Sequence, residues 1–268
     1  MTSLKEALKN KLPEQEIPTS YDMIGNIAIF SKLPNNIKKQ KLIANTLLKI
    51  NPNIKTVLLK TKKFSGKYRL PKFKILDGIK TKETLHKENN CIFKLDVEKC
   101  YFSPRLANER LRIAKQIKSN EIILVMFSGI AIYPIIISKN SSAKEIYSIE
   151  INPIADYYAK ENLMLNKINN VRLFKGDVKE ILPKIKLKFN RIVMPAPKNA
   201  EKYLQLIKNK IKKNTIIHFY DFSQEKDFPK ASINKIKKYF KKIKILKAIK
   251  CGNVSPYNYR VCIDFQVL

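Results

Sequence analysis

From position 121 onward, short apolar runs alternate with longer segments in which apolar residues recur every three or four positions. The short runs predict buried strands, and the longer spacing predicts helices. We expect strands over 121–126, 145–149, 171–174, 189–194 and 215–220, with helices near 131–139, 153–166 and 199–212. This alternation predicts an α/β fold built on a doubly wound, mostly parallel sheet.

The pattern changes after Asp221, where a helix is expected over 229–241 and two strands over 243–250 and 259–267. Two consecutive strands with only a short connection predict an antiparallel hairpin. Placed on the edge of the sheet, this hairpin brings the expected number of strands to seven.

The part of the chain before position 104 predicts a small α+β unit. Its expected elements are strands over 24–30, 55–60 and 68–76, a helix over 37–50, and a hairpin of 84–86 with 91–95. Pro104 follows the potential N-cap Ser103 and predicts a helix over 104–118. We therefore expect a helix or extension over 1–20, a small α+β domain over 21–103 and the α/β domain over 104–268.

The charge of the chain is strongly positive. Its 268 residues carry 54 Lys+Arg against 22 Asp+Glu, a formal net charge of +32. Such an excess is typical of proteins that bind polyanions, because phosphates attract Lys and Arg. A genome biased toward Lys, Ile and Asn would also raise the charge, so composition alone leaves both explanations open.

In the small domain, basic and aromatic residues interleave in the region around Ser65-Gly66. The basic residues include Lys60, Lys62, Lys67 and Arg69, and the rings are Phe64, Tyr68 and Phe73. Rings that stack on bases beside cations that hold phosphates suit RNA. A solvated strand face has the same composition, so both interpretations stay open.

No membrane segment or metal site is predicted. The apolar stretch over 122–137 is shorter than the ~20 residues of a membrane span, and Ser128, Gly129 and Pro134 interrupt it. The first residues lack the apolar block of a signal peptide, so we expect a cytoplasmic protein. The four cysteines show no C-x-x-C spacing, which indicates reduced thiols rather than zinc ligands or a disulfide framework.

Polar and turn-forming residues stand where the expected strands end. Open parallel sheets bind ligands outside the carboxyl ends of their strands, so these residues predict one pocket. The four segments are Met126-Phe127-Ser128-Gly129, Glu150-Ile151-Asn152-Pro153, Gly176-Asp177 and Met194-Pro195-Ala196-Pro197.

Glu150 is the most informative member of this set. It lies 21 residues beyond Gly129, a spacing that suits a carboxylate gripping ribose hydroxyls after one helical crossover. Asp177 is placed to meet an adenine amino group, and Pro195 and Pro197 form rigid walls. Each residue also has a plain structural interpretation, as a cap, a turn or a strand terminator.

A further cluster, residues 101–110, precedes the sheet. Arg105 and Arg110 are candidate contacts to phosphate or base, and Glu109 is a candidate proton acceptor. The first turn of an ordinary helix holds the same residue types.

Taken in order, these motifs resemble the archaeal and eukaryotic tRNA guanosine-37 N1-methyltransferase family over roughly residues 20–265. The resemblance rests on Leu95-Asp96 to Arg110, the four pocket segments, Asn162, Leu165-Asn166-Lys167, Lys198-Asn199-Ala200 and Ile217-His218-Phe219-Tyr220. It implies a class I (Rossmann-like) methyltransferase domain that uses S-adenosylmethionine and acts on tRNA near the anticodon, preceded by a small tRNA-contacting domain. Fuller members carry a further N-terminal domain for the tRNA outer corner, and we expect this chain to be too short to hold it.

The resemblance also implies roles for individual residues. Those implied around the cofactor are Met126, Phe127, Ser128, Gly129, Tyr133, Glu150, Ile151, Asn152, Asp177, Val178 and Pro195. Arg110 holds the target base, with Glu109 and then Glu150 as candidate proton acceptors and with Pro195 and Pro197 lining the reaction site. The implied substrate contacts are Arg105, Arg110, Lys198 and Tyr101.

One departure from the family pattern points to a branch. Most members have Asn-Leu-Pro after the fourth strand, whereas Pro195 occupies the asparagine position here. This form resembles the archaeal wyosine branch, which methylates C7 of 4-demethylwyosine to give isowyosine and in some members also N1 of guanosine. We expect the chain to catalyse both reactions, as a monomer.

Two other functions remain open. An aminocarboxypropyl transferase of the same pathway uses the same cofactor but moves its other substituent. A non-catalytic RNA-binding protein would explain the single-glycine turn at Gly129 and the missing asparagine. A DNA or polyamine methyltransferase is disfavoured, because the fourth strand lacks the Asp/Asn-Pro-Pro-aromatic motif.

Overall fold

The computed structural model describes residues 3–195 and 200–268. It divides into two compact units, one of Met1–Glu88 with Ile92–Pro104 and one of Asn89–Cys91 with Arg105–Leu268. We call them the amino-terminal and the carboxy-terminal unit and describe each by itself.

The amino-terminal unit is built on a four-stranded sheet in the order β1-β2-β3-β4. The strands are β1 (Asp22–Ile24), β2 (Ile27–Phe30), β3 (Thr56–Ser65) and β4 (Leu70–Gly78). β2 and β3 are parallel and joined by α2 (Ile37–Ile50), whereas the other two pairs are antiparallel. β5 (Glu83–Glu88) and β6 (Cys91–Asp96) form a separate two-stranded sheet, the expected hairpin.

The single strand expected over 24–30 is instead two strands, because the chain turns at Gly25. This residue has φ +56°, and a Cβ there would lie 2.1 Å from Thr84 Oγ1. Only glycine fits both the left-handed conformation and the close approach.

The start of the chain packs into the same core as this sheet. α1 (Leu4–Leu8) is capped by the Ser3 side chain and is followed by η1 (Glu14–Glu16). Leu4, Leu8 and Leu12 share one hydrophobic cluster with Ile43 and Leu47 of α2. Burial of these leucines stabilises a helix that is too short to be stable alone.

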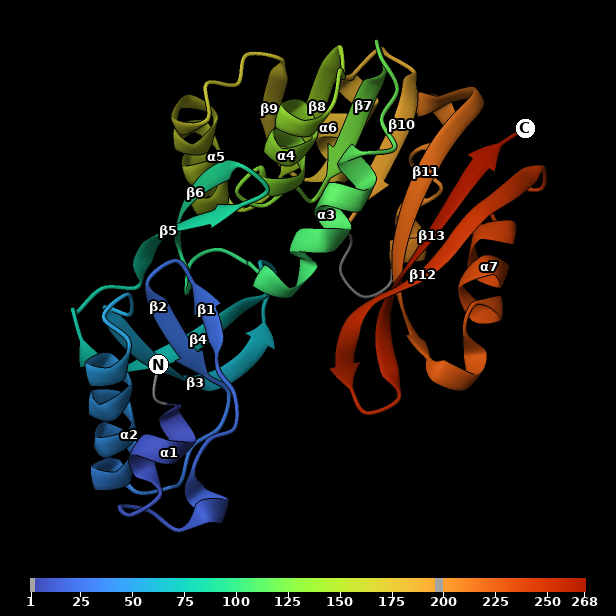
Figure 1. Cartoon of the computed structure of the whole chain (residues 1–268). Coiled ribbons are helices and arrows are strands. Elements are labelled where there is room, and N and C mark those ends of the chain that lie inside the picture. The colour runs from blue at the N-terminus through green and yellow to red at the C-terminus, as the bar shows by residue number, and fades with distance from the viewer. Residues whose placement is uncertain (1–2, 196–199) are drawn as a thin grey trace. The chain divides into compact units, whose positions relative to one another are not determined.

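The carboxy-terminal unit contains a seven-stranded sheet in the order β12-β13-β11-β10-β7-β8-β9, drawn from green to red in Figure 1. The strands are β7 (Ile122–Met126), β8 (Glu145–Glu150), β9 (Val171–Lys175), β10 (Phe189–Met194), β11 (Ile211–Gln224), β12 (Ile243–Ser255) and β13 (Asn258–Val267). β7 to β11 are parallel, whereas β13 runs antiparallel to both β11 and β12. The doubly wound sheet with an antiparallel edge hairpin is confirmed.

Helices cover both faces of this sheet. On one face, Leu124, Met126 and Ile192 pack in a cluster with residues of α6 (Val178–Lys184) and α7 (Lys230–Lys237). The alternate strand residues, such as Ile123 and Val125, point to the opposite face. There α4 (Ile132–Asn140) and α5 (Pro153–Leu165) contact β8 and β9, and α3 (Ala107–Ala114) contacts α4.

Two helix predictions were wrong in part. The helix expected over 199–212 is replaced, in its described part, by the short turns η3 (Ala200–Tyr203) and η4 (Lys208–Lys210), after which β11 begins. The ammonium of Lys210 donates to the carbonyl oxygens of Pro183 and Ile185, and tertiary contacts of this kind can outweigh local helix preference. The helix expected over 104–118 is a 3₁₀ turn, η2 (Pro104–Leu106), followed by α3, whose N-cap is Leu106 rather than Ser103.

Among the described residues, no helix combines the length and the apolar character that a membrane crossing requires.

Candidate active site

The carboxyl ends of four parallel strands lie along one edge of the large sheet. β10, β7, β8 and β9 are neighbours, with Met126 paired to Ile149 and Ile149 paired to Phe174. This register places the turn over 126–129, the end of β8 and the end of β9 next to one another, as the sequence predicts. Pro195 follows β10 at the same edge and is half-buried, while Pro197 and Lys198 lie outside the described residues.

The turn between β7 and α4 has an unusual backbone. Phe127, Gly129 and Ala131 all have left-handed φ values, of 55°, 58° and 61°. The Ser128 N–H donates to the Ile149 carbonyl at 3.1 Å, and the Ser148 hydroxyl donates to the Ser128 hydroxyl at 2.8 Å. Two of the three left-handed positions are not glycine, so bonds to β8 hold a conformation that local sequence disfavours.

Glu150, the last residue of β8, is held by backbone N–H groups of Gly129, Ile151 and Asn152. The Gly129 N–H donates to Oε2 and the Asn152 N–H donates to Oε1, both at 2.7 Å. Burial raises the pKa of Glu150, against the lowering effect of these hydrogen bonds. An ionised carboxylate has about four acceptor sites, so Glu150 keeps acceptor capacity for a ligand hydroxyl.

Asp177 caps a helix and lies next to the end of β9, close to Glu150. Its side chain caps α6 by accepting the Lys179 N–H at 2.9 Å, and the neighbouring Gly176 N–H donates to the Glu150 carbonyl at 2.8 Å. The bond from Gly176 ties the end of β9 to Glu150. Val178 is buried beside this cap and Ile151 is half-buried after Glu150, which provides apolar surface close to the carboxylates.

Glu109 and Tyr133 meet at the buried hydroxyl of Tyr220 from β11. Tyr220 donates to Glu109 Oε1 at 2.5 Å, and Tyr133 donates to the Tyr220 hydroxyl at 3.0 Å. Burial raises the pKa of Tyr133, the Glu109 charge raises it further, and the nearby charge of Arg110 opposes the rise. The structure thus brings Tyr133 of α4 together with Glu109 and Arg110 of α3, and all three are buried.

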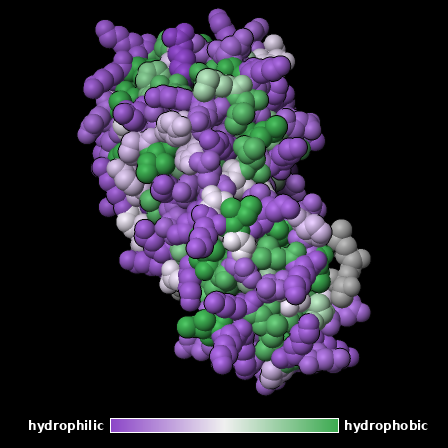
Figure 2. Space-filling view, turned by 90° about the vertical axis from the view of Figure 1, so that its left-hand side faces the viewer, coloured by the Kyte–Doolittle hydropathy of each residue, from purple (hydrophilic) through white to green (hydrophobic). Residues whose placement is uncertain are grey.

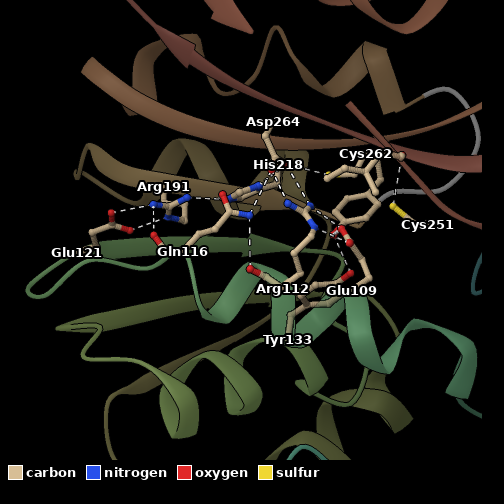
Figure 3. Close-up of polar contacts among 12 residues, drawn as sticks. Glu109, Arg112, Gln116, Glu121, Tyr133, Arg191, His218, Cys251, Cys262 and Asp264 are labelled. Atoms are coloured by element: carbon tan, nitrogen blue, oxygen red, sulfur yellow. Dashed lines mark hydrogen bonds and ion pairs between the residues drawn. The ribbon is translucent and has the colours of Figure 1, made fainter. Parts of the chain in front are cut away.

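Arg112, three residues after Glu109, occupies both oxygens of that carboxylate. Its Nε and Nη2 donate to Glu109 at 2.7 Å each, and its Nη1 donates to Asp264 of β13 at 2.6 Å. Asp264 also bonds Nδ1 of His218 at 2.6 Å, and His218 Nε2 lies 2.8 Å from Nη1 of Arg191. Arg191 then forms an ion pair with Glu121 at 2.6 Å (Figure 3).

The protonation states in this network follow from burial and charge. Burial lowers the pKa of His218, although Asp264 pulls it upward. Neutral His218 therefore donates its Nδ1–H to Asp264 and accepts from Arg191 at Nε2. Burial opposes ionisation of Asp264, but the hydrogen bonds from His218 and Arg112 outweigh it and hold the pKa of this carboxyl well below its usual range.

Sequence reasoning did not single out Arg112, Arg191 or Asp264. A signal was present, because Asp264 stands between Ile263 and Phe265, and Arg191 opens an apolar run in β10. Charged residues inside apolar strands are rarely buried unless they are paired.

The remaining predicted contacts lie elsewhere on the chain. Arg105 is exposed in η2. Tyr101, in the amino-terminal unit, packs against Phe64 with ring centroids 5.0 Å apart, and the Arg69 guanidinium lies 5.5 Å from the Tyr101 ring. Lys60 Nζ lies 3.9 Å from the centroid of Phe64. We call Lys60, Phe64, Arg69 and Tyr101 the aromatic-basic cluster.

The surface agrees with the high charge of the chain. Figure 2 shows hydrophilic residues over most of the visible face, with apolar groups in smaller patches between them. A net charge of +32 on such a surface attracts a polyanion over long range.

Both parts of the chain match known protein families. Residues 84–247 match the TRM5/TYW2 methyltransferase domain, and residues 4–81 match the TYW2 N-terminal domain. The tRNA (guanine(37)-N(1))-methyltransferase Trm5b of Pyrococcus abyssi is 37% identical over 256 residues, which cover 94% of this chain and 76% of that protein. The tRNA 4-demethylwyosine(37)-methyltransferase Taw21 of Saccharolobus solfataricus is 34% identical over 269 residues, which cover 98% of this chain and 99% of that protein.

A solved structure, the complex of aTrm5 and tRNALeu, has the same fold. It superimposes with a TM-score of 0.88 at 30% identity and covers 99% of this chain and 78% of its own. The family match spans more than half of the chain. The chain belongs to the TRM5/TYW2 methyltransferase family.

Proposed function

We propose that this chain methylates the purine at position 37 of tRNA, at N1 of guanosine, at C7 of 4-demethylwyosine or at both, with S-adenosylmethionine as the methyl donor. The observation that carries the proposal is Glu150, held at the carboxyl edge of the sheet by the N–H groups of Gly129 and Asn152. Open α/β sheets place nucleotide-type ligands at this edge.

The residues at this edge fit the cofactor. Glu150 keeps acceptor capacity for a ribose hydroxyl, and the Asp177 carboxylate stands at the end of the neighbouring strand, where an adenine amino group would lie. Val178 and Ile151 offer apolar surface to the adenine, and the turn over 126–129 with Tyr133 completes the binding site. S-adenosylmethionine, when bound, supplies an electrophilic methyl group.

Arg110 holds the purine and the negative charge that develops on its oxygen. It is buried beside Tyr133, in a water-poor environment where a fixed positive charge stabilises an anion most strongly. Methylation at N1 also requires a group that accepts the N1 proton.

Glu150 is the better candidate for this proton acceptor, the reverse of the order expected from the sequence. Both oxygens of Glu109 are bonded to Arg112, and Oε1 also accepts from Tyr220. Burial raises the pKa of Glu150, which suits a carboxylate that must take up a proton. Glu109 instead positions Arg112 and Tyr220 around the reaction site.

Pro195 supports the proposal that the enzyme accepts the larger, tricyclic base of 4-demethylwyosine. It has no N–H to donate where most of the family has asparagine, so it imposes no hydrogen bond on the base. The aromatic-basic cluster supports a tRNA-contacting role for the amino-terminal unit, because rings beside cations bind nucleic acid. We further propose that the protein works as a monomer in the cytoplasm.

The deciding experiment uses tRNA carrying either guanosine or 4-demethylwyosine at position 37. The tRNA is incubated with the enzyme and cofactor labelled in its methyl group, and its nucleosides are analysed by mass spectrometry. We expect labelled N1-methylguanosine from the first substrate and labelled isowyosine from the second.

Other outcomes would identify the alternatives. An aminocarboxypropyl transferase would add the larger substituent and leave the label on the spent cofactor. A non-catalytic RNA-binding protein would bind tRNA but neither bind the cofactor in calorimetry nor transfer label.

A further inference from the structure

Three strands of the large sheet run well beyond the others at the edge that holds the candidate active site. Met194, the last residue of β10, pairs with Phe219 of β11, but β11 continues through Tyr220 to Gln224. β13 stays paired with β11 to its end, where Gln224 lies opposite Asn258. Five further residues correspond to about 17 Å of strand, and Figure 1 shows the ends of β12 and β13 reaching past β10.

The tip of this extension carries an exposed aromatic ring. Tyr257, in the turn between β12 and β13, is 75% exposed, and Val254, near the end of β12, is 55% exposed. Tyr257 has φ +58°, a conformation usually left to glycine or asparagine. Its carbonyl accepts the Glu225 N–H at 2.9 Å, so the turn is tied to the chain after β11 and its ring is presented on an anchored loop.

Cations lie over aromatic rings along the same extension. Lys250 Nζ is 4.4 Å from the centroid of Tyr259, and it also pairs with Glu225 at 2.7 Å. The Arg260 guanidinium lies 5.5 Å from the ring of Phe222. Rings alternating with cations bind single-stranded RNA, because bases stack on the rings and the cations attract phosphates.

We propose that the tip of the β12–β13 hairpin binds an unpaired nucleotide of the tRNA close to the methylated purine, with its base stacked on Tyr257. Resting on the proposed function, this inference adds a contact surface within the carboxy-terminal unit. The position of the tip at the active edge of the sheet favours RNA over a protein partner, and so does the charge of +32 on the chain.

Tyr257→Ala and Tyr257→Phe test the inference in the full chain. The matched control is Tyr157→Ala, which removes a 56% exposed tyrosine of α5 whose hydroxyl bonds Glu161. Affinities are measured for unmodified tRNA, for its isolated anticodon stem-loop and for S-adenosylmethionine. We expect Tyr257→Ala to weaken binding of both RNAs by roughly 5-fold to 100-fold, the effect of losing one base–aromatic stack.

Tyr257→Phe should stay within about two-fold of wild type, because phenylalanine also stacks. Tyr157→Ala should change neither RNA affinity, and cofactor affinity should stay constant in all three variants. A 2-aminopurine placed beside position 37 should be quenched by the wild type and less so by Tyr257→Ala.

Wild-type RNA affinity in Tyr257→Ala would overturn the inference and leave the tip to a protein partner or to no partner. Equal losses in Tyr257→Ala and Tyr157→Ala would overturn it as well. The proposed function is tested separately, by methylation of tRNA with the wild type. The binding measurements on these variants do not test it, so failure of one proposal can be told from failure of the other.

Discussion

Arg112 of α3 and Asp264 of β13 form an ion pair of 2.6 Å between positions 152 residues apart in the chain. Arg112 simultaneously holds Glu109 on its own helix. One guanidinium therefore links α3, which carries Arg110, to β13, the neighbour of β11 on the side away from β10.

Removing the guanidinium should destabilise the protein strongly. Arg112→Met leaves Glu109 and Asp264, both almost fully buried, without their shared cation. We expect the free energy of unfolding to fall by about 3–5 kcal/mol, as is typical when one partner of a buried ion pair is removed. Arg112→Lys keeps the charge and should lose less, so denaturant unfolding curves with equal losses for the two variants would contradict this role.

His218 should make stability depend on pH. Its pKa is lowered in the folded protein by burial, so below an unfolded pKa of about 6.5 the unfolded chain binds the extra proton. The contribution is thus fully present above that pH and is lost as the pH falls through it, with a slope of at most about 1.4 kcal/mol per pH unit.

The measurement is urea unfolding between pH 5 and pH 8. Asp264, whose pKa is lowered, adds no slope in this window, because its contribution is lost only at much lower pH. His218→Gln has an amide that does not titrate, and it should flatten the curve, with His86 as the only histidine left. A curve of unchanged slope in the variant would assign the dependence to other groups.

Arg110 should act on turnover rather than on cofactor binding. Arg110→Ala removes the positive charge that we propose holds the purine oxygen, and we expect kcat to fall at least about 100-fold, the loss seen when one group that stabilises an oxyanion is removed. Cofactor affinity, measured by calorimetry, should change by less than about two-fold. Arg110→Lys should recover part of kcat, and equal losses in turnover and cofactor affinity would contradict the assignment.

Glu150 should control cofactor binding and the dependence of the methylation rate on pH at the acid side. The Glu150→Gln amide has a single acceptor oxygen for the Gly129 and Asn152 N–H groups, so we expect cofactor affinity to fall roughly ten-fold, for about 1.4 kcal/mol. In the wild type, the rate should rise with pH through a pKa above the usual carboxyl value, because burial raises it. This rise of the rate with pH should be absent in the Glu150→Gln variant.

The matched control for this prediction is Glu180→Gln, a substitution of an exposed glutamate on α6, which should leave both affinity and profile unchanged. A Glu150→Gln variant with wild-type cofactor affinity but reduced kcat at saturating cofactor would assign Glu150 to proton transfer alone.

Much of the fold follows from local pattern. The bounds of α2 and β10 agree with expectation to the residue, because each is a clear run of periodic or continuous apolar positions. The segment at 200–210 does not, and its Lys210 bonds carbonyl oxygens near position 185, a long-range contact that local pattern does not reveal. The turn at Gly25 was not predicted either. The side chain that leaves no room for a Cβ at this position belongs to Thr84, which lies 59 positions away in the sequence.

By itself, the sequence determined the alternation of strands and helices in the large sheet apart from the segment at 199–212, the strand ends that carry Glu150 and Asp177, and the motifs that identify the family. These features are local, since hydrophobic periodicity and turn residues act over a few positions. Only the tertiary structure decided that Glu109 is occupied by Arg112, that His218 is neutral between Asp264 and Arg191, and that the β12–β13 hairpin reaches past the active edge. Those properties depend on burial and on charges brought together from distant positions, which no local pattern records.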